Sequence, residues 1–277
     1  MRPVLFYLPF GLPLYGYGAM LCLSVLIGRY LALRLAEQEG MDPKMMNRCC
    51  AWTLAGAIIS ARLLYVATNP DQFDQAIDVL RWWKGGVVAY GGFLGGLAGS
   101  IAFCRIHRLN VLAWADCAVP SLCVGLMITR IGCFLGGCDF GQPWDGPWAV
   151  HFPAGSPAFQ QQMLQGLLPA SATQSLAVHP TQLYESLAGL ALLVLVMAVR
   201  RRHTHSGQAF AAFFLGYAVL RFGIEIVRAD LERGTVGPFS TSQFIAVATF
   251  MLAATLWVLL RRGRVHGLPS GRRVSVS

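Results

Sequence analysis

The sequence predicts an all-α polytopic membrane protein with about seven transmembrane helices. The mean hydropathy of the 277 residues is +0.53, and 55% of them are hydrophobic. Charged residues make up only 13%, against about 25% in typical soluble domains. The hydrophobic residues gather into separate runs with polar connections between them, which is typical of helices that cross a bilayer.

Seven apolar runs give the expected helices in order. They cover residues 14–35, 49–67, 86–104, 111–131, 182–199, 208–227 and 241–260. A spanning helix needs about 20 predominantly apolar residues, so each run can cross most of a membrane. The first run is expected to remain as a span, because only Arg2 precedes it as a basic residue and its apolar segment is too long for a cleavable signal peptide.

Lysine and arginine divide unequally between alternate connections. Thirteen lie after the first, third and fifth runs and in the tail, whereas the alternate connections hold five. Because cytoplasmic loops are enriched in Lys and Arg, the N-terminus is expected outside and the C-terminus in the cytoplasm. The net charge of +9 is therefore interpreted as a topology signal, and no nucleic-acid partner is expected. The tail, 261–277, is expected to be basic and cytoplasmic.

The longest connection, 136–179, lies between the fourth and fifth runs. Five prolines and several aromatic residues interrupt it. This composition predicts a small folded cap on the outer, periplasmic face rather than a flexible linker. No second soluble domain is expected, so residues 1–277 are interpreted as one integral membrane domain that carries this cap.

The third run opens with closely spaced glycines. Gly91, Gly95 and Gly99 lie four residues apart and share one helix face. Small residues at this spacing let two helices approach closely, so packing is favoured over a ligand role. Tyr90 precedes them near the outer boundary, where tyrosines commonly lie among lipid headgroups.

The stretch from Thr129 to Gly141 combines a cation with small residues. Arg130 ends the fourth run, and a glycine-rich loop is expected to follow it at once. A cation at this depth must face protein, a phosphate or water, because hydrocarbon cannot solvate it. Glycines let backbone N–H groups come close to a ligand. An anion site is therefore expected here.

Two more charged clusters lie at the outer ends of the fifth and sixth runs. Glu185 is expected to have a partner, because an unpaired carboxylate in the membrane is costly. Arg221, Glu225 and Arg228 are spaced to share one helix face. Taken alone, this spacing fits a structural ion pair as well as a functional site.

A common depth connects these residues. Five runs place polar side chains in the outer part of the membrane, namely Arg62, Tyr90, Arg130, His179, Glu185, Arg221, Glu225 and Arg228. One outward-facing, net cationic cavity explains this convergence. Such a cavity beside lipid suits an anionic phospholipid headgroup.

Several segments carry a resemblance to a known family. The segment His179-Pro180-Thr181-Gln182-Leu183-Tyr184-Glu185 resembles the His-Pro-(Ser/Thr)-Gln-Leu-Tyr-Glu segment of prolipoprotein diacylglyceryl transferases. The segment Arg130-Ile131-Gly132-Cys133-Phe134, with Gly137 and Gly141, resembles the signature of that family, Gly-Arg-(Ile/Leu)-Gly-Asn-Phe followed by a glycine-containing loop. Smaller matches are Tyr17-Gly18, Arg62, Gly91-Gly92, and Arg221-Phe222 with Glu225 and Arg228.

The resemblance covers nearly the whole chain in order, and it includes the seven-span topology. Three positions depart from the family pattern. Tyr90 stands where the family commonly has histidine, Cys133 where the signature has asparagine, and Thr129 where it has glycine.

The resemblance implies transfer of the diacylglyceryl group of phosphatidylglycerol to the thiol of a prolipoprotein lipobox cysteine. A thioether forms and glycerol 1-phosphate leaves. The implied location is the bacterial cytoplasmic (inner) membrane. The implied partners are phosphatidylglycerol, the signal-peptide region of a prolipoprotein and the bilayer. No cofactor is expected, and no metal, since no zinc-type ligand spacing is present in the sequence.

The resemblance also implies residue roles. Arg130 and Arg221 bind the phosphate, which arginine contacts through two donors, and Glu225 orients Arg221. Tyr90 is expected in the catalytic site, either as a base, for which its ordinary pKa of about 10 is poor, or as a hydrogen-bonding partner of the phosphate. His179, Glu185 and Glu225 are alternative bases. The residues expected to bind substrate are Tyr17, Arg62, Gly91, Gly92, Gly137, Gly141, His179, Gln182, Tyr184, Glu185 and Arg228.

Some alternatives stay open at this point. Cys133 and Cys138 face an oxidising compartment in the expected topology, and both a disulfide and two thiols fit their spacing. A non-enzymatic membrane binder of anionic phospholipid or lipopeptide on the same fold is the second function class, which Tyr90 keeps open. A small transporter is the third, and the absence of a matching pair of broken helices argues against it.

Overall fold

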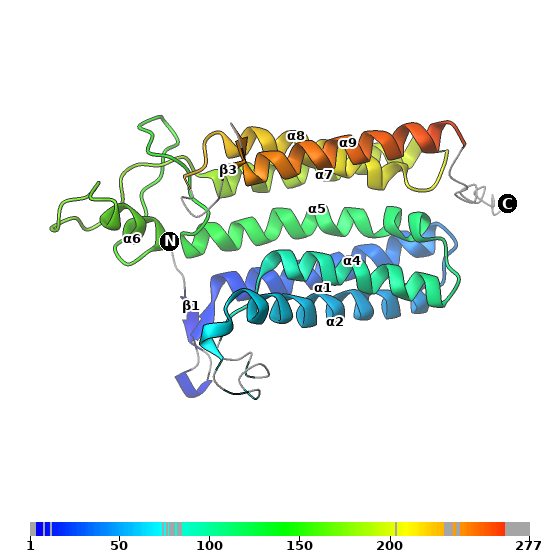
Figure 1. Ribbon diagram of the computed structural model, residues 1–277, viewed down its shortest axis with the longest axis horizontal. Coiled ribbons are helices and arrows are strands. Elements are labelled where there is room, and N and C mark those ends of the chain that lie inside the picture. Colours follow the sequence, from blue (N-terminus) through cyan, green and yellow to red (C-terminus); the bar gives the residue numbers. More distant parts are fainter. Residues whose placement is uncertain are drawn as a thin grey trace. The chain divides into compact units, whose positions relative to one another are not determined.

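The structure is a computed structural model that describes residues 4–7, 9–11, 13–73, 75, 77, 81, 85–202, 204–229, 235–236 and 239–263. Its helices are α1 (Gly16–Gln38), α2 (Pro43–Thr68), α4 (Ala89–Ile106), α5 (Val111–Gly136), α6 (Pro157–Leu164), α7 (Thr181–Arg202), α8 (Gln208–Glu225) and α9 (Thr241–Arg261) (Figure 1). Two short antiparallel pairs join β1 (Val4–Tyr7) to β2 (Pro13–Tyr15) and β3 (Thr235–Val236) to β4 (Phe239–Ser240). The 3-10 turns η1 (Pro9–Gly11) and η2 (Pro70–Gln72) complete the described elements.

The mainly α-helical fold is confirmed, and each of the seven apolar runs corresponds to a helix. Five described helices, α1, α2, α5, α7 and α9, are long and apolar enough to cross a membrane. The helices α4 and α8 have 18 residues each. At a rise of 1.5 Å per residue they are about 27 Å long, close to the roughly 30 Å of a hydrocarbon core. The remaining helix, α6, lies between α5 and α7.

Two expected helix ends are wrong. The helix α5 continues to Gly136, so the residues directly after Arg130 are helical and the loop begins at Gly137, whose φ of +76° favours glycine. The helix α8 ends at Glu225, so Arg228 lies beyond it, and only Arg221 and Glu225 share the expected helix face.

Contacts between Cα atoms divide the chain into two compact units. The first holds the described residues up to Leu31 and from Ala118 onward, and the second holds Ala32–Cys117. The boundary passes through α1 and α5. The division of the chain into one membrane domain with a cap and a cytoplasmic tail stays a prediction, and residues 264–277 of that tail lie outside the described residues.

The second unit is built on close packing of α2 against α4. A Cβ atom added at Gly95 would lie 2.2 Å from the carbonyl oxygen of Gly56, and one added at Gly99 would lie 2.6 Å from that of Trp52. Only glycine permits this approach, so the packing role that the glycine spacing predicts is confirmed. The helix α2 begins at Pro43, where the side chain of Asp42 accepts a hydrogen bond from the backbone N–H of Lys44.

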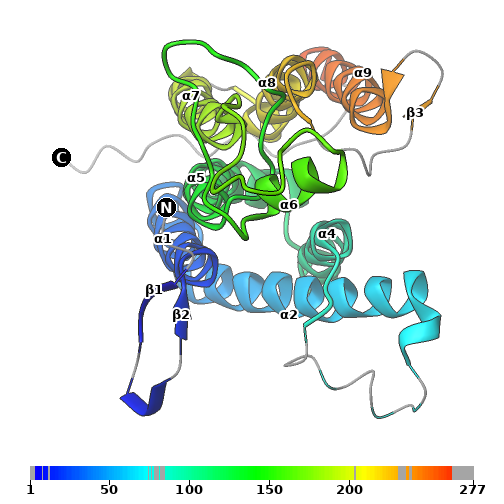
Figure 2. The ribbon, with the colours of Figure 1, turned by 90° about the vertical axis from the view of Figure 1, so that its left-hand side faces the viewer.

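In the first unit, α7, α8 and α9 lie side by side (Figure 2). Val119 and Cys123 of α5 are buried together with Leu192, Val196 and Phe213 of α7 and α8. The helix α9 begins with a capping box, in which the side chains of Ser240 and Gln243 each bond to the backbone of the other residue. The Ser240 hydroxyl also donates to Glu225 Oε1, which joins the start of α9 to the end of α8.

The connection between α5 and α7 has a small core of its own. Phe140, Phe152, Ala158 and Val178 are buried together. Backbone hydrogen bonds join Val150 to Val178 in both directions. The segment is therefore folded and not a flexible linker, and its position on the outer face stays a prediction.

Candidate active site

Six charged side chains of the first unit form one connected set, which we call the ion-pair network. They come from α5, the loop after it, α7, and the end of α8 with the residues that follow. They are Arg130, Asp139, Glu185, Arg221, Glu225 and Arg228. These residues lie in three separate parts of the sequence, 130–139, 185 and 221–228, so the fold is needed to bring them together.

Glu185 is the centre of the network. Arg130 contacts Glu185 Oε2 through Nε, and Arg228 Nη1 lies 2.8 Å from Glu185 Oε1. Arg221 Nη1 lies 3.4 Å from the same Oε1. The expected partner of Glu185 is thus confirmed as three arginines. Because guanidinium groups bind both carboxylate oxygens, the geometry favours Glu185 as the group that orders these arginines.

Asp139 is a member of the network that the sequence interpretation missed. Its Oδ2 lies 2.6 Å from Arg130 Nη1, and its Oδ1 pairs with Arg228. Asp139 has a φ of +57°, a region that aspartate tolerates better than most residues. Its carbonyl oxygen accepts a hydrogen bond of 2.6 Å from the Thr181 hydroxyl. A signal was present in the sequence, because the four arginines expected at one depth exceed the two glutamates expected there and leave positive charge to be balanced.

Arg221 and Glu225 form the pair that their spacing predicts. Arg221 Nη2 lies 2.7 Å from Glu225 Oε2. The Ser240 hydroxyl donates to Glu225 Oε1 at 2.9 Å, and Arg221 Nη2 donates to the Ser242 hydroxyl at 3.3 Å. No pattern in the sequence indicates these two serines, because a serine at a helix start is an ordinary cap.

The network is balanced in charge and not net cationic, because its three arginines face three carboxylates. Two facts account for the difference from the expected cationic cavity: Asp139 adds a carboxylate, and Arg62 lies in the second unit and not in the network. Burying several guanidinium groups without partners would be costly, so close pairing is the arrangement that a folded protein can sustain.

Exposure separates the arginines. The side chain of Arg130 is 21% exposed, that of Arg221 is 12% and that of Arg228 is 2%. Among the carboxylates, Asp139 is 27% exposed and Glu185 only 5%. The Arg130–Asp139 pair is therefore the most exposed part of the network, and Arg228 is its most buried arginine.

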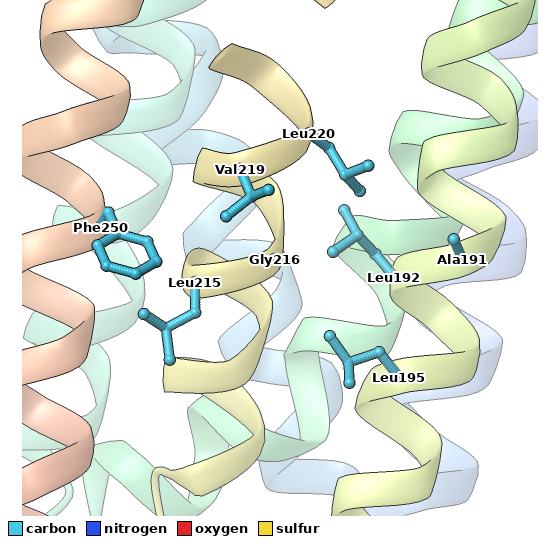
Figure 3. A pocket seen from close by; sticks show the side chains of 8 residues that line it. All are labelled: Ala191, Leu192, Leu195, Leu215, Gly216, Val219, Leu220 and Phe250. Atoms are coloured by element: carbon cyan, nitrogen blue, oxygen red, sulfur yellow. The ribbon is translucent and has the colours of Figure 1, made fainter. Parts of the chain in front are cut away.

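An apolar groove with a volume of about 400 Å³ lies between α7, α8 and α9 (Figure 3). Its walls include Leu195, Val219 and Phe250. Leu192 and Leu220 line this groove and also a small crevice that reaches Glu185 and Arg221. The groove is thus adjacent to one edge of the ion-pair network.

Comparison with known proteins places this arrangement in a family. A family model described as prolipoprotein diacylglyceryl transferase matches residues 3–259. The chain belongs to the prolipoprotein diacylglyceryl transferase family. A relative from Clostridium tetani, named phosphatidylglycerol–prolipoprotein diacylglyceryl transferase, is 32% identical over 252 residues, which cover 91% of this chain and 95% of the relative. A relative of the same name from Thermosynechococcus vestitus is 33% identical over 248 residues and 88% of this chain.

The two glycines of the loop after α5 serve this diacylglyceryl transferase fold. A Cβ atom at Gly141 would lie 2.6 Å from His179 Cβ and 2.8 Å from the Val227 carbonyl oxygen. One at Gly137 would lie 3.0 Å from the Phe152 ring. Both glycines permit close approach of protein segments, and a role for them in substrate binding stays a prediction.

Gln182 and Tyr17 lie near the network without joining it. Gln182 is buried in the first turn of α7, and its Nε2 donates to the Cys138 carbonyl oxygen at 2.5 Å. Tyr17 begins α1, and a Cβ atom at Gly132 would lie 3.2 Å from its Cα atom. Tyr17 is therefore next to the turn of α5 that follows Arg130.

His179 and Tyr184 belong to an aromatic cluster. The Trp144 ring stacks on His179 with a centroid distance of 4.3 Å, and the Tyr184 hydroxyl lies 3.2 Å from His179 Nδ1. Trp148 donates its Nε1–H to the same hydroxyl at 2.7 Å. The sequence interpretation did not single out these two tryptophans.

The other predicted site residues lie in the second unit. Arg62 is buried, and its Nη1 donates to the carbonyl oxygens of Gly85 at 2.7 Å and Gly86 at 2.9 Å. Gly91 packs on α2, where an added Cβ atom would lie 2.6 Å from the Ser60 carbonyl oxygen, and Gly92 follows it. Tyr90 is exposed at the start of α4. Their participation in one cavity with the network stays a prediction.

Proposed function

We propose that the chain transfers the diacylglyceryl group of phosphatidylglycerol to the cysteine thiol of a prolipoprotein lipobox. The C–O bond between the diacylglyceryl group and the phosphate breaks, a C–S bond forms, and glycerol 1-phosphate leaves. The observation that carries this proposal is the ion-pair network beside an apolar groove, since a phospholipid has the same two parts. The names of the curated relatives support the same activity.

Arg130 is the arginine that contacts the phosphate first. It is the most exposed of the three, and one of its two carboxylate partners, Asp139, is exposed as well. A phosphate oxygen can exchange with Asp139 at Arg130 while Glu185 keeps the guanidinium in place. Arg221 then adds its charge from the side of the groove. Glu225 and Ser242 hold Arg221, and Ser240 holds Glu225. This pairing gives the leaving phosphate preorganised donors.

The groove between α7 and α8 takes one acyl chain. In a bilayer an acyl chain gains little from the hydrophobic effect when it moves from lipid to protein, because both surroundings are apolar. The contacts to the headgroup therefore provide the affinity for the lipid, and the groove positions its acyl chain. It aligns the glyceryl carbon with the crevice that reaches Glu185 and Arg221.

The acceptor must be deprotonated, because a thiolate and not a thiol is the nucleophile. The site faces outward in the inner membrane, as the distribution of Lys and Arg favours. Tyr90 acts as a hydrogen-bond donor to the phosphate, since a neutral hydroxyl at membrane depth costs less than a phenolate.

The test is a transfer assay on the purified full chain with phosphatidylglycerol and a lipobox peptide, read by the mass of the thioether product. The parent should give product. Arg130→Ala should abolish it, and Arg130→Lys should be poor, because lysine cannot make a planar two-point contact. Arg34→Ala is the matched control, since Arg34 is exposed and is not part of the ion-pair network. A parent that binds the lipid but yields no product contradicts the proposal.

A further inference from the structure

The chain contains two pairs of neighbouring thiols. The sulfur atoms of Cys133 and Cys138 in the first unit lie within 4.8 Å of each other, and the Cys138 thiol donates to the Cys133 carbonyl oxygen at 3.7 Å. Cys49 and Cys104 in the second unit are buried in one cluster where α2 packs on α4. All eight cysteines of the chain are thiols in the structure. The two pairs can therefore be compared directly.

The turn at the end of α5 holds Cys133 and Cys138 on the same side. Cys133 lies in the last turn of the helix, and Gly137, with a φ of +76°, turns the chain back toward it. The backbone N–H of Cys138 donates to the Cys133 carbonyl oxygen at 3.2 Å. A disulfide needs sulfur atoms at bonding distance and Cβ atoms about 3.5–4.5 Å apart. The two sulfur atoms already lie within 4.8 Å of each other in this turn.

The two pairs lie toward opposite membrane faces in the proposed orientation. Cys49 is near the start of α2 and Cys104 near the end of α4, and Arg48 and Arg105 are their sequence neighbours. These ends adjoin the Lys- and Arg-rich connections, which are cytoplasmic. Cys133 and Cys138 lie at the other end of the spans, where the compartment is oxidising. Disulfides persist outside the cytosol and are rare within it.

We propose that Cys133 and Cys138 are a disulfide site, and that Cys49 and Cys104 remain a dithiol. The proposal rests on the proposed orientation and not on the proposed transfer reaction. The disulfide fixes the loop that carries Asp139 onto the end of α5. The disulfide therefore restrains Asp139, which pairs with Arg130 in the most exposed part of the ion-pair network.

The oxidant is a disulfide-carrying molecule, RSSR. Cys138 is more exposed than Cys133 and reacts first. The neighbouring Cys133 side chain lowers the pKa of the Cys138 thiol and favours the thiolate. That thiolate attacks one sulfur of RSSR and releases RS⁻. Cys133 then loses its proton and attacks the mixed disulfide. In total two protein thiols and one RSSR become one protein disulfide and two RSH, so the two electrons lost by the cysteines reduce the oxidant.

A metal site is the competing use of these residues. Cys133, Cys138 and Asp139 place possible ligand atoms within 4.8 Å of one another. However, both oxygens of Asp139 already pair with Arg130 and Arg228. Two guanidinium charges at this position disfavour a divalent cation, so the geometry favours the disulfide.

The test is thiol labelling of the full chain in cells, which are quenched in acid, denatured and alkylated before and after reduction. Peptide masses then report each cysteine. Without reductant, the Cys133 and Cys138 peptide should stay unlabelled and be lighter by two hydrogen atoms than the dithiol. Cys49, Cys104 and the exposed Cys22 should be fully labelled. In a Cys138→Ser variant, Cys133 should become available to the label.

Three results overturn the proposal. The first is full labelling of Cys133 and Cys138 without reductant. The second is protection that a chelator releases and a reductant does not, which indicates a bound metal. The third is oxidation of Cys49 and Cys104 instead, which indicates the inverse orientation. A failed transfer assay on the same preparation leaves the labelling result unaffected, so the two proposals fail separately.

Discussion

At Arg130 one guanidinium faces two carboxylates in different surroundings. Glu185 is buried and is bound by two further arginines, so it is fixed. Asp139 lies on a loop and is the most exposed acid of the network. An entering phosphate can displace the second carboxylate much more easily than the first. Asp139 thus holds Arg130 in place and also competes with an anionic ligand.

The variant Asp139→Asn tests this competition. It removes one negative charge, while Arg130 and Arg228 both keep Glu185 as a partner. We expect the KM for phosphatidylglycerol to fall by about tenfold, equivalent to about 1.4 kcal/mol. The free energy of unfolding should fall by about 1–3 kcal/mol, the usual worth of a hydrogen bond to a charged group. Steady-state kinetics in mixed micelles and thermal denaturation measure the two effects.

The matched control is Asp145→Asn, which alters an exposed acid of the same connection. It should change neither the KM for phosphatidylglycerol nor the free energy of unfolding. An increase in KM for Asp139→Asn, with an unchanged Asp145→Asn, would mean that Asp139 only positions the arginines and does not compete with the phosphate.

Residue-level prediction from the sequence succeeded where spacing along one helix decides contact. Arg221 and Glu225 are one helical turn apart, and the sequence alone predicts their pair. Asp139 and Ser240 reach the network from separate segments. Hydropathy and spacing carry no information about such contacts. Only the structure therefore shows the exposed Arg130–Asp139 pair.

At the scale of helices, the sequence predicts which helices form better than it predicts where each helix ends. Each apolar run became a helix, because burial in a bilayer requires backbone groups to bond within their own segment. The end of α5 was misplaced because Gly132 was interpreted as a loop residue. In the structure Gly132 lets α5 pack closely on Tyr17 and Met20 of α1. Glycine at such a crossing continues the helix, and only the partner helix reveals this.

The groove is formed by several helices together. A variant that fills the groove tests whether it takes an acyl chain. Val219 lines the groove and is exposed. Val219→Trp should fill it and lower transfer about tenfold, which corresponds to about 1.4 kcal/mol, without a loss of insertion. The reason is steric, since the substituted side chain occupies the path of an acyl chain.

Val258→Trp is the control for this experiment. Val258 is also exposed, lies on α9 and does not line the groove. Transfer rates with purified variants and equal lipid give the comparison. Equal rates for both variants would remove the groove from the substrate path.

For the whole molecule, orientation decides which compartment the network and the thiol pairs face. Charge asymmetry gives a physical basis, since Arg200, Arg201 and Arg202 end α7 and the connection before it carries no Lys or Arg. The connection before α7 is folded around its own core. A reporter protein inserted in this connection shows which compartment the connection faces.

Reporter fusions at two sites test the orientation. A reporter inserted after Gly155, in the connection between α5 and α7, should be active only in its exported form. A reporter after Ser206, between α7 and α8, should be active only in its cytoplasmic form. The two sites flank a single span, α7, so opposite signals are required by its crossing. A cytoplasmic signal at Gly155 with an exported signal at Ser206 would invert the chain. The ion-pair network would then face the cytoplasm, and the proposed access of an exported lipobox thiol would fail.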